Sequence, residues 1–417
     1  MRSSAFLYPW DVLGDPAAPA RLRDLGVDGV TLASAYHSAR ALTPRHPATR
    51  IVTAPHSAVY YPAASARWSG HDLRPYQQEW LPGDDPWGEA AQALRDVGLE
   101  VSSWVVLAHN SRLGDDFPAS SVCNAYGDRY PWALCAARPE VVRYCTELAA
   151  EAGARPGAVA AELESCGWYG LAHLHAHDKT GGVQLDGAAQ YLMSLCFCDV
   201  CSAAWADAGA PDLDAAVRSA LEPVWRGGGT PAGGPAGSPA GGQGSGQGSA
   251  GAGGYADRAE EWAAVEQLLG ADLARLTLDH RAARALELQR GCVSAVRAAA
   301  GEGFRVYLHA DPAVHRVGAN VGVDVARLGR GPAAPDGLVL PCTGPDGLGN
   351  ALPELAAAWP GGRLAANLTV VSGLGGDPAL PATAPPAADE LRLYHAGLAS
   401  DPDLVVLRQA LAGAAGR

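Results

Sequence analysis

The chain has 417 residues, 48% of them hydrophobic and 18% charged, which is enough for one large core or two smaller ones. Its formal net charge of −13 argues against nucleic acid or an anionic membrane surface as the main partner, because both are bound by basic patches. No stretch reaches the roughly 18 apolar residues of a membrane span, and the first residues lack the pattern of a signal peptide.

Short apolar runs alternate with amphipathic runs, as in α/β proteins with a parallel sheet. The predicted strands span residues 5–10, 28–34, 100–107, 157–164, 304–310, 337–342, 363–371 and 403–408. The predicted helices between them span residues 16–25, 87–97, 139–152, 352–359 and 388–398. Eight strands close a (β/α)8 TIM barrel, so we predict one barrel over residues 1–417. A doubly wound open sheet is the alternative, but no strand–helix junction carries the Gly-x-Gly-x-x-Gly turn.

The connection after the fourth predicted strand is much longer than the others. It begins with a cysteine-containing insertion at residues 165–226. Residues 227–254 are almost entirely Gly, Ala, Pro, Ser and Gln, a composition that buries too little apolar surface to order itself, so we predict a disordered segment there. Residues 255–303 have apolar side chains at helical spacing, which predicts amphipathic helices that return to the barrel.

Polar and aromatic residues follow the predicted strands at their carboxyl ends, where TIM barrels place their active sites. The residues that we expect to bind substrate there are Tyr8, Trp10, Asp11, Tyr36, His37, His109, Asn110 and His309. Glu164 ends the fourth strand and Asp311 follows the fifth, so these are the carboxyl groups best placed for acid–base chemistry.

Side-chain alternation predicts which residues of strands four and five point into the barrel. Glu162 shares the inward face with Glu164, and Arg305 shares the inward face of the next strand with His309. A buried carboxylate needs a partner, and we expect Arg305 to neutralise Glu162, which leaves Glu164 as the better acid or base. Burial would raise the pKa of Glu164, whereas protonated histidines would lower it, so the sequence leaves the direction open.

Three of the nine cysteines, Cys196, Cys198 and Cys201, lie within six residues at the spacing of metal ligands. Tetrahedral zinc needs a fourth ligand, for which we choose Cys135, with Cys123 as the alternative. All-thiolate zinc has no open coordination position, so such a site is structural; a set of free buried thiols is the competing interpretation. The odd cysteine count favours a reducing compartment over a disulfide framework, and we expect a cytoplasmic protein.

The run His173-Leu-His-Ala-His-Asp-Lys-Thr180 offers alternate histidines and an aspartate, which are ligands of catalytic metals. We favour a polar loop above the barrel mouth instead, because a hydrolase metal centre normally gathers its ligands from several strands. A histidine-based metal-dependent hydrolase is therefore the lesser alternative.

From residue 130 to residue 205 the chain resembles the β-galactosidases of glycoside hydrolase family 42. The matching features are Cys135 ahead of the helix start Pro139-Glu140, the strand ending in Glu164, and Cys196-Phe-Cys198-x-x-Cys201 leading to Trp205. In that family four cysteines so placed bind a structural zinc, and the glutamate ending strand four is the general acid. The resemblance implies the same roles for Cys135, Cys196, Cys198 and Cys201, and for Glu164.

Two departures separate the chain from that family. The family has Asn before its acid, where this chain has Leu163, and its nucleophile is a glutamate ending strand seven, whereas residues 365–371 contain none. We therefore predict a glycoside hydrolase-like protein that cleaves a glycosidic bond, with Glu164 as general acid and Asp311 as second carboxylate. The alternative is a catalytically degenerate barrel that binds a small saccharide or glycoside without cleaving it.

Overall fold

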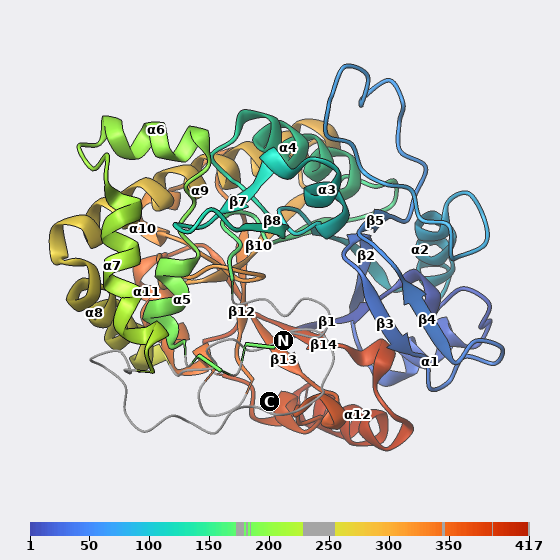
Figure 1. Cartoon of the computed structure of the whole chain (residues 1–417). Coiled ribbons are helices and arrows are strands. Elements are labelled where there is room, and N and C mark those ends of the chain that lie inside the picture. The colour runs from blue at the N-terminus through green and yellow to red at the C-terminus, as the bar shows by residue number, and fades with distance from the viewer. Residues whose placement is uncertain are drawn as a thin grey trace.

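Eight parallel strands close into a barrel in the computed structural model, which describes residues 1–171, 179–180, 182–183, 185–227, 255–343, 347–385 and 387–415 (Figure 1). The barrel strands are β1 (Arg2–Leu7), β2 (Gly29–Tyr36), β6 (Glu100–Val106), β9 (Ala160–Glu164), β10 (Arg305–Asp311), β12 (Gly337–Pro341), β13 (Arg363–Thr369) and β14 (Glu390–Tyr394). Each pairs with the next in chain order, and β1 pairs with both β2 and β14, which closes the ring. The predicted TIM barrel is confirmed.

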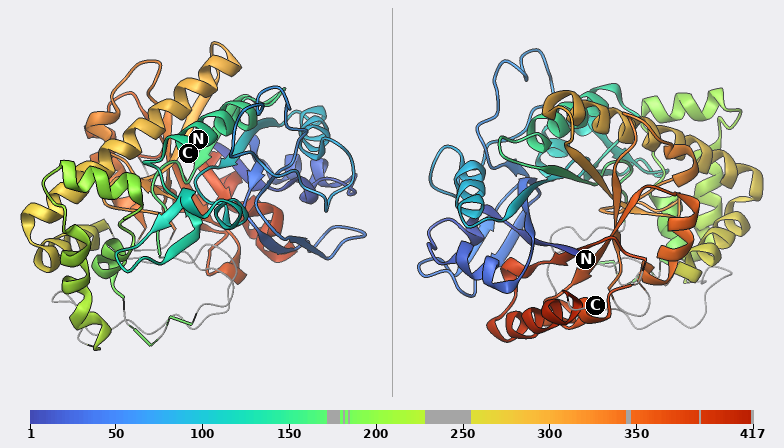
Figure 2. Two further views of the ribbon diagram at one scale, coloured as in Figure 1. Left: turned by 45° about the horizontal axis from the view of Figure 1, so that its top comes forward. Right: turned by 180° about the vertical axis from the view of Figure 1, so that it is seen from behind.

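Helices surround this ring and bury their apolar faces against the outside of the strands (Figure 2). The helices that follow the barrel strands are α1 (Ala18–Leu25), α2 (Pro86–Asp96), α4 (Pro139–Gly153), α9 (Ala271–Ala300), α10 (Val325–Leu328), α11 (Leu352–Ala358) and α12 (Asp401–Ala415). Among the described residues, no helix combines the length and the apolarity needed to cross a bilayer.

The carboxyl ends of several strands carry short additional elements. They are β3 (Ala39–Leu42), β4 (Ile51–Ala54) and β5 (Ala58–Val59) after β2, α3 (Ser111–Asp116), β7 (Ser121–Cys123) and β8 (Arg129–Leu134) after β6, and β11 (Val321–Gly322) after β10. Strands β3 and β4 form one antiparallel hairpin and β7 and β8 another. These elements build up the rim of the barrel mouth.

The insertion after β9 is helical. It contains α5 (Gly187–Met193), α6 (Asp199–Asp207), α7 (Leu213–Trp225) and α8 (Tyr255–Leu269), and α8 packs against α5, α7 and α9. Val217 and Leu221 of α7 and Val265 of α8 have no exposed surface, so the insertion has an apolar core that continues into the barrel's own. Residues 228–254, which hold nearly all of the predicted disordered segment, lie outside the described residues.

The eighth strand is not where the sequence pattern placed it. We predicted a helix at 388–398 and a strand at 403–408, but the chain forms β14 at Glu390–Tyr394 and α12 at Asp401–Ala415. The helix begins with a capping box, in which Asp403 N donates to Ser400 Oγ (3.2 Å) and Ser400 N donates to Asp403 Oδ2 (3.3 Å). The apolar run after Asp403 therefore belongs to a helix.

Charged side chains fill the lower part of the barrel interior. Near the amino ends of the strands, Glu100 pairs with Arg2 and with Arg305 (3.2 Å), and Glu390 pairs with Arg363 (3.2 Å). Beside them is a small buried cluster, separate from the main core, made of Ala160, Tyr307, Val339 and Ala365. The polar groups at the mouth lie above this cluster, on the same inward faces of the strands.

Candidate functional site

Glu164 ends β9 at the barrel mouth, with its side chain directed inward. It is 2% exposed, and its Oε2 accepts a 2.8 Å hydrogen bond from Nε1 of Trp104 on the neighbouring β6. Within the described part of the chain, no hydrogen bond reaches its Oε1. The next residue, Ser165, has a φ of 55°, a left-handed conformation that is uncommon outside glycine and concentrates at functional sites. Trp104 therefore fixes one carboxyl oxygen and leaves the other available.

Glu162 lies two residues earlier on the same inward face and is fully buried. Its Oε1 accepts hydrogen bonds from Nε of Arg392 (2.5 Å) and from the Thr31 hydroxyl (3.2 Å). We predicted Arg305 as its partner, and that was wrong. Arg305 is in register with Ala160, one inward-facing position nearer the amino end than Glu162, and it pairs with Glu100 and Glu390 instead.

His309 on β10 lies between the two glutamates. Its Nε2 is 3.4 Å from Oε2 of Glu162, and its Nδ1 is 3.9 Å from Oε2 of Glu164. The ring is 3% exposed, parallel to Trp104 at 14°, with the ring centroids 6.4 Å apart. The site therefore groups two carboxyls, one imidazole and one guanidinium, that of Arg392, in a dry environment.

The two glutamates have opposite pKa shifts. Burial raises the pKa of Glu164; the charge of His309 and the Trp104 hydrogen bond oppose this rise, and the charge of Glu162 adds to it. Burial alone would also raise the pKa of Glu162, but the contacts with Arg392 and His309 together outweigh burial and the pKa is lowered. Glu164 therefore keeps a proton to higher pH than an ordinary glutamate, whereas Glu162 is the ionised member of the pair.

Aromatic side chains line the rest of the mouth. Tyr8 stacks on Trp10 (4.2 Å between centroids) and on His395 (4.7 Å), and Tyr36 meets Trp104 edge to face (4.6 Å). Burial raises the pKa of Tyr36, Tyr169 and Tyr394, and the charge of Glu164 contributes to each rise, so these three phenols surround that carboxyl. Burial also lowers the pKa of His395 to about 3, which keeps its ring neutral.

The predicted substrate-binding residues of the second and third loops lie beside this lining. The ring of His37 stacks on Tyr36 (4.1 Å) and meets His109 (4.9 Å), and burial lowers the pKa of His37 to about 4. His109 stacks on Tyr169 (4.4 Å) and donates from Nδ1 to the Trp132 carbonyl (2.7 Å). Asn110 caps α3, accepting from Leu113 N (3.0 Å), a contact that fixes the loop.

Asp11 faces a small cavity beside the mouth. Its Oδ2 accepts from Tyr8 N (2.8 Å), and burial raises its pKa to about 7 despite the opposing charge of Arg45. The cavity has a volume of about 30 Å³ and is bounded by α1, the hairpin turn that carries Arg45 and the segment after β14. Asp11 thus braces the first loop against the last one.

Asp311, the predicted second carboxylate, forms a bidentate ion pair with an insertion helix. Arg258 of α8 donates to both of its oxygens, at 2.7 to 3.0 Å, and both side chains are under 10% exposed. Next to this pair, Glu261 contacts Arg316 (2.7 Å) and His315 (3.2 Å). The structure thus places Asp311 where α8 meets the end of β10, while Glu162, Glu164 and His309 form a group of their own.

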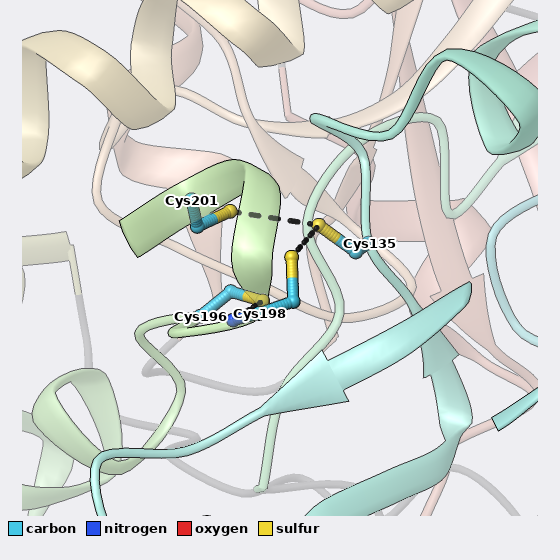
Figure 3. Close-up of side chains that lie close together, drawn as sticks. All are labelled: Cys135, Cys196, Cys198 and Cys201. Atoms are coloured by element: carbon cyan, nitrogen blue, oxygen red, sulfur yellow. Dashed lines mark hydrogen bonds between the residues drawn. The ribbon is translucent and has the colours of Figure 1, made fainter. Parts of the chain in front are cut away.

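Four buried cysteines meet away from the mouth, between the loop before α4 and the start of α6 (Figure 3). The sulfur atoms of Cys135, Cys196, Cys198 and Cys201 lie within 4.8 Å of one another, with Cys135 at 3.8 Å from Cys198 and 3.6 Å from Cys201. The expected sulfur separation around tetrahedral zinc is roughly 3.8 Å, given Zn–S bonds of about 2.3 Å. The group can bind a metal, and Cys123 is not part of it.

The competing run from His173 to Thr180 has most of its members at residues 172–178, outside the described residues. Across the described part of the chain, the cysteine group is the one cluster of three or more potential ligands close enough to share an ion.

No family model and no curated protein matches the sequence. Solved structures do resemble the chain. The glycoside hydrolase domain of PgaB (BpsB) from Bordetella bronchiseptica has a TM-score of 0.54 at 13% identity, over 99% of each chain. The chain therefore shares its barrel fold with this domain.

Two larger proteins share this fold. An α-L-fucosidase isoenzyme 2 from Paenibacillus thiaminolyticus matches with a TM-score of 0.50 and 11% identity, over 99% of this chain and 49% of the fucosidase. A β-galactosidase from the psychrophilic Marinomonas ef1 matches with a TM-score of 0.50 and 11% identity, over 99% of this chain and 59% of that one. The chain thus spans only about half to three-fifths of the length of these two enzymes.

Sequence reasoning missed Tyr169 and His395 of the aromatic lining, and also Trp104, Arg392 and Tyr394. Trp104 lies within an apolar run, so the sequence did not indicate that its ring nitrogen donates a hydrogen bond to Glu164. Arg392 and Tyr394 were missed because the eighth strand was predicted at the wrong residues. The run Glu390-Leu-Arg-Leu-Tyr394 alternates polar and apolar residues, and that period of two was the available signal.

Proposed function

We propose that the protein hydrolyses a glycosidic bond, with Glu164 as the general acid. The observation that carries this proposal is the environment of its carboxyl group: it ends strand four of a glycoside hydrolase-type barrel, Trp104 holds one oxygen, and burial raises its pKa. A neutral carboxyl can give its proton to the departing glycosidic oxygen near neutral pH. The aromatic rings at the mouth, Tyr8 and Tyr36 among them, are the side chains that would stack on the apolar face of a sugar.

Asp311 remains the proposed second carboxylate. In this role it would act from within its ion pair with Arg258. Carboxyl groups about 5–5.5 Å apart correspond to retention of configuration and roughly 6.5–9.5 Å to inversion, so the stereochemistry of the product would report which arrangement operates.

The test is hydrolysis of a panel of aryl glycosides by the wild type and by Glu164→Gln. We expect the variant to lose about 10²–10⁴-fold in kcat/KM, and less with activated leaving groups that need little protonation. Glu354→Gln, an exposed carboxyl on α11, is the matched control and should leave the rate unchanged. Equal rates for the wild type and Glu164→Gln would remove Glu164 from the reaction.

A second candidate is a barrel that binds a saccharide without cleaving it. Two observations favour it: arginines hold both Glu162 and Asp311, and β13 ends without a carboxylate. Calorimetry with the same sugars separates the two functions, because binding with no turnover at any pH would support this candidate.

We further propose that the four-cysteine group holds a structural zinc. The support is its all-thiolate composition, its burial and sulfur separations that suit tetrahedral zinc. Four sulfurs leave no open coordination position, so the ion would tie Cys135 to the insertion and take no part in hydrolysis.

A further inference from the structure

His309 has one ring nitrogen facing each of the two buried glutamates. Arg392 and Thr31 occupy Oε1 of Glu162, so its Oε2 is left to face Nε2 of His309 at 3.4 Å. Neither Oε2 nor Nε2 has a hydrogen-bond partner among the described residues, and each has the other as its polar contact. Because a buried donor or acceptor without a partner is costly, the proton of a neutral His309 belongs on Nε2, directed at Glu162.

This tautomer has a consequence for the other nitrogen. With the proton on Nε2, the lone pair of Nδ1 faces Oε2 of Glu164, 3.9 Å away. The chain Arg392–Glu162–His309 thus orients an acceptor toward the carboxyl group of the proposed general acid, and Trp104 holds that carboxyl from the other side.

We propose that His309 is a positioning residue that sets the protonation of Glu164. This inference rests on the proposed function. After Glu164 has given its proton to the departing oxygen, Nδ1 of His309 takes up a proton from solvent, and the imidazolium balances the new carboxylate.

The surroundings leave His309 as the group whose charge can change beside Glu164. The ionised Glu162 is balanced by Arg392, which also pairs with Glu390 (3.0 Å). Burial keeps the other titratable neighbours neutral near pH 7; these are Tyr8 after β1, Tyr36 on β2, Tyr169 after β9, Tyr394 on β14 and the adjacent His395. Phe6 and Trp104, which also pack against the ring, carry no charge.

The experiment follows the Glu164 carboxyl directly, whether or not a substrate is known. Protein carrying ¹³C at the glutamate carboxyl carbons is titrated by NMR, and the Glu164 signal is identified by its loss in Glu164→Gln. In His309→Gln we expect the titration midpoint of this signal to rise by on the order of one pH unit, because a positive neighbour is lost. The alkaline limit of kcat/KM should move the same way.

His315→Gln is the matched control. His315 is also a buried histidine paired with a glutamate, Glu261, but it lies in the ion-pair cluster beside Asp311. Its replacement should leave the Glu164 midpoint unchanged. A midpoint unmoved in His309→Gln, or moved equally by both substitutions, would overturn the proposal.

A measurement on the wild type alone guards against a variant that fails to fold. The ¹⁵N shifts of the His309 ring should show the proton on Nε2 at high pH. A proton on Nδ1 would overturn the proposal. If no glycoside is cleaved and yet the Glu164 midpoint rises in His309→Gln, the proposed hydrolysis fails while the His309 pairing stands.

Discussion

Glu162 and Glu164 show that the surroundings of a glutamate, and not its residue type, decide the direction of its pKa shift. They lie on one strand, face the same way and are both buried, yet their pKa values shift in opposite directions because only Glu162 contacts a guanidinium. Strand alternation predicted that both would point inward. The partner of Glu162 was not predictable, because it depends on the register of strands that are distant in sequence.

The raised pKa of Glu164 predicts a pH dependence of stability. The native state holds this proton to higher pH than the unfolded chain, whose glutamate titrates near 4.5, so the contribution of the group is complete below that pH and is lost as pH rises through the folded value. Glu164→Gln cannot ionise and lacks this loss. We therefore expect the free energy of unfolding of Glu164→Gln to rise relative to that of the wild type as pH increases above 4.5. The full rise is about 1.4 kcal/mol per unit of pKa shift.

Urea unfolding of both proteins at a series of pH values measures this difference. Glu354→Gln again serves as the exposed control. A difference that stays constant with pH would show that Glu164 has an ordinary pKa in the folded protein.

At the scale of elements, seven of the eight strands follow from apolar runs bounded by glycines, and the eighth does not. The run after Asp403 is as apolar as a buried strand, whereas β14 begins with Glu390 and has Arg392 at its centre. Those charges are tolerated because they pair with each other at 3.0 Å inside the barrel. Whether a strand can carry charged residues inside a barrel depends on partners from other parts of the chain. The residue propensities of that one strand therefore do not predict it.

The helical assignment of α12 gives a prediction of its own. Leu407 is fully buried and Val406 beside it is 38% exposed. Leu407→Ala should lower the free energy of unfolding by about 2–5 kcal/mol, because it leaves a cavity between α12 and the barrel. Val406→Ala should change it by less than about 0.5 kcal/mol. Denaturant unfolding measures both values, and equal losses would contradict the packing of this helix.

At the scale of the molecule, two contacts secure the long insertion to the barrel. The Arg258–Asp311 ion pair joins α8 to the end of β10, and the cysteine group joins the loop before α4 to the start of α6. The cysteine spacing and the choice of Cys135 were available from the sequence. The Arg258–Asp311 ion pair could not be predicted from the sequence. Arg258 follows a long low-complexity segment, so its position relative to the barrel strands does not follow from the chain order.

Zinc at the cysteine group should therefore stabilise the whole molecule. Its ligands come from two distant parts of the chain, so binding favours the folded over the unfolded state. We expect protein purified without added metal to contain about one zinc per chain. Chelation or Cys198→Ser should remove it and lower the Tm by roughly 5–10 °C. Cys342→Ser, which alters a buried cysteine outside the group, should keep the zinc. Elemental analysis and thermal unfolding decide the matter, since a metal-free wild type with an undiminished Tm would leave these four sulfurs as ordinary buried thiols.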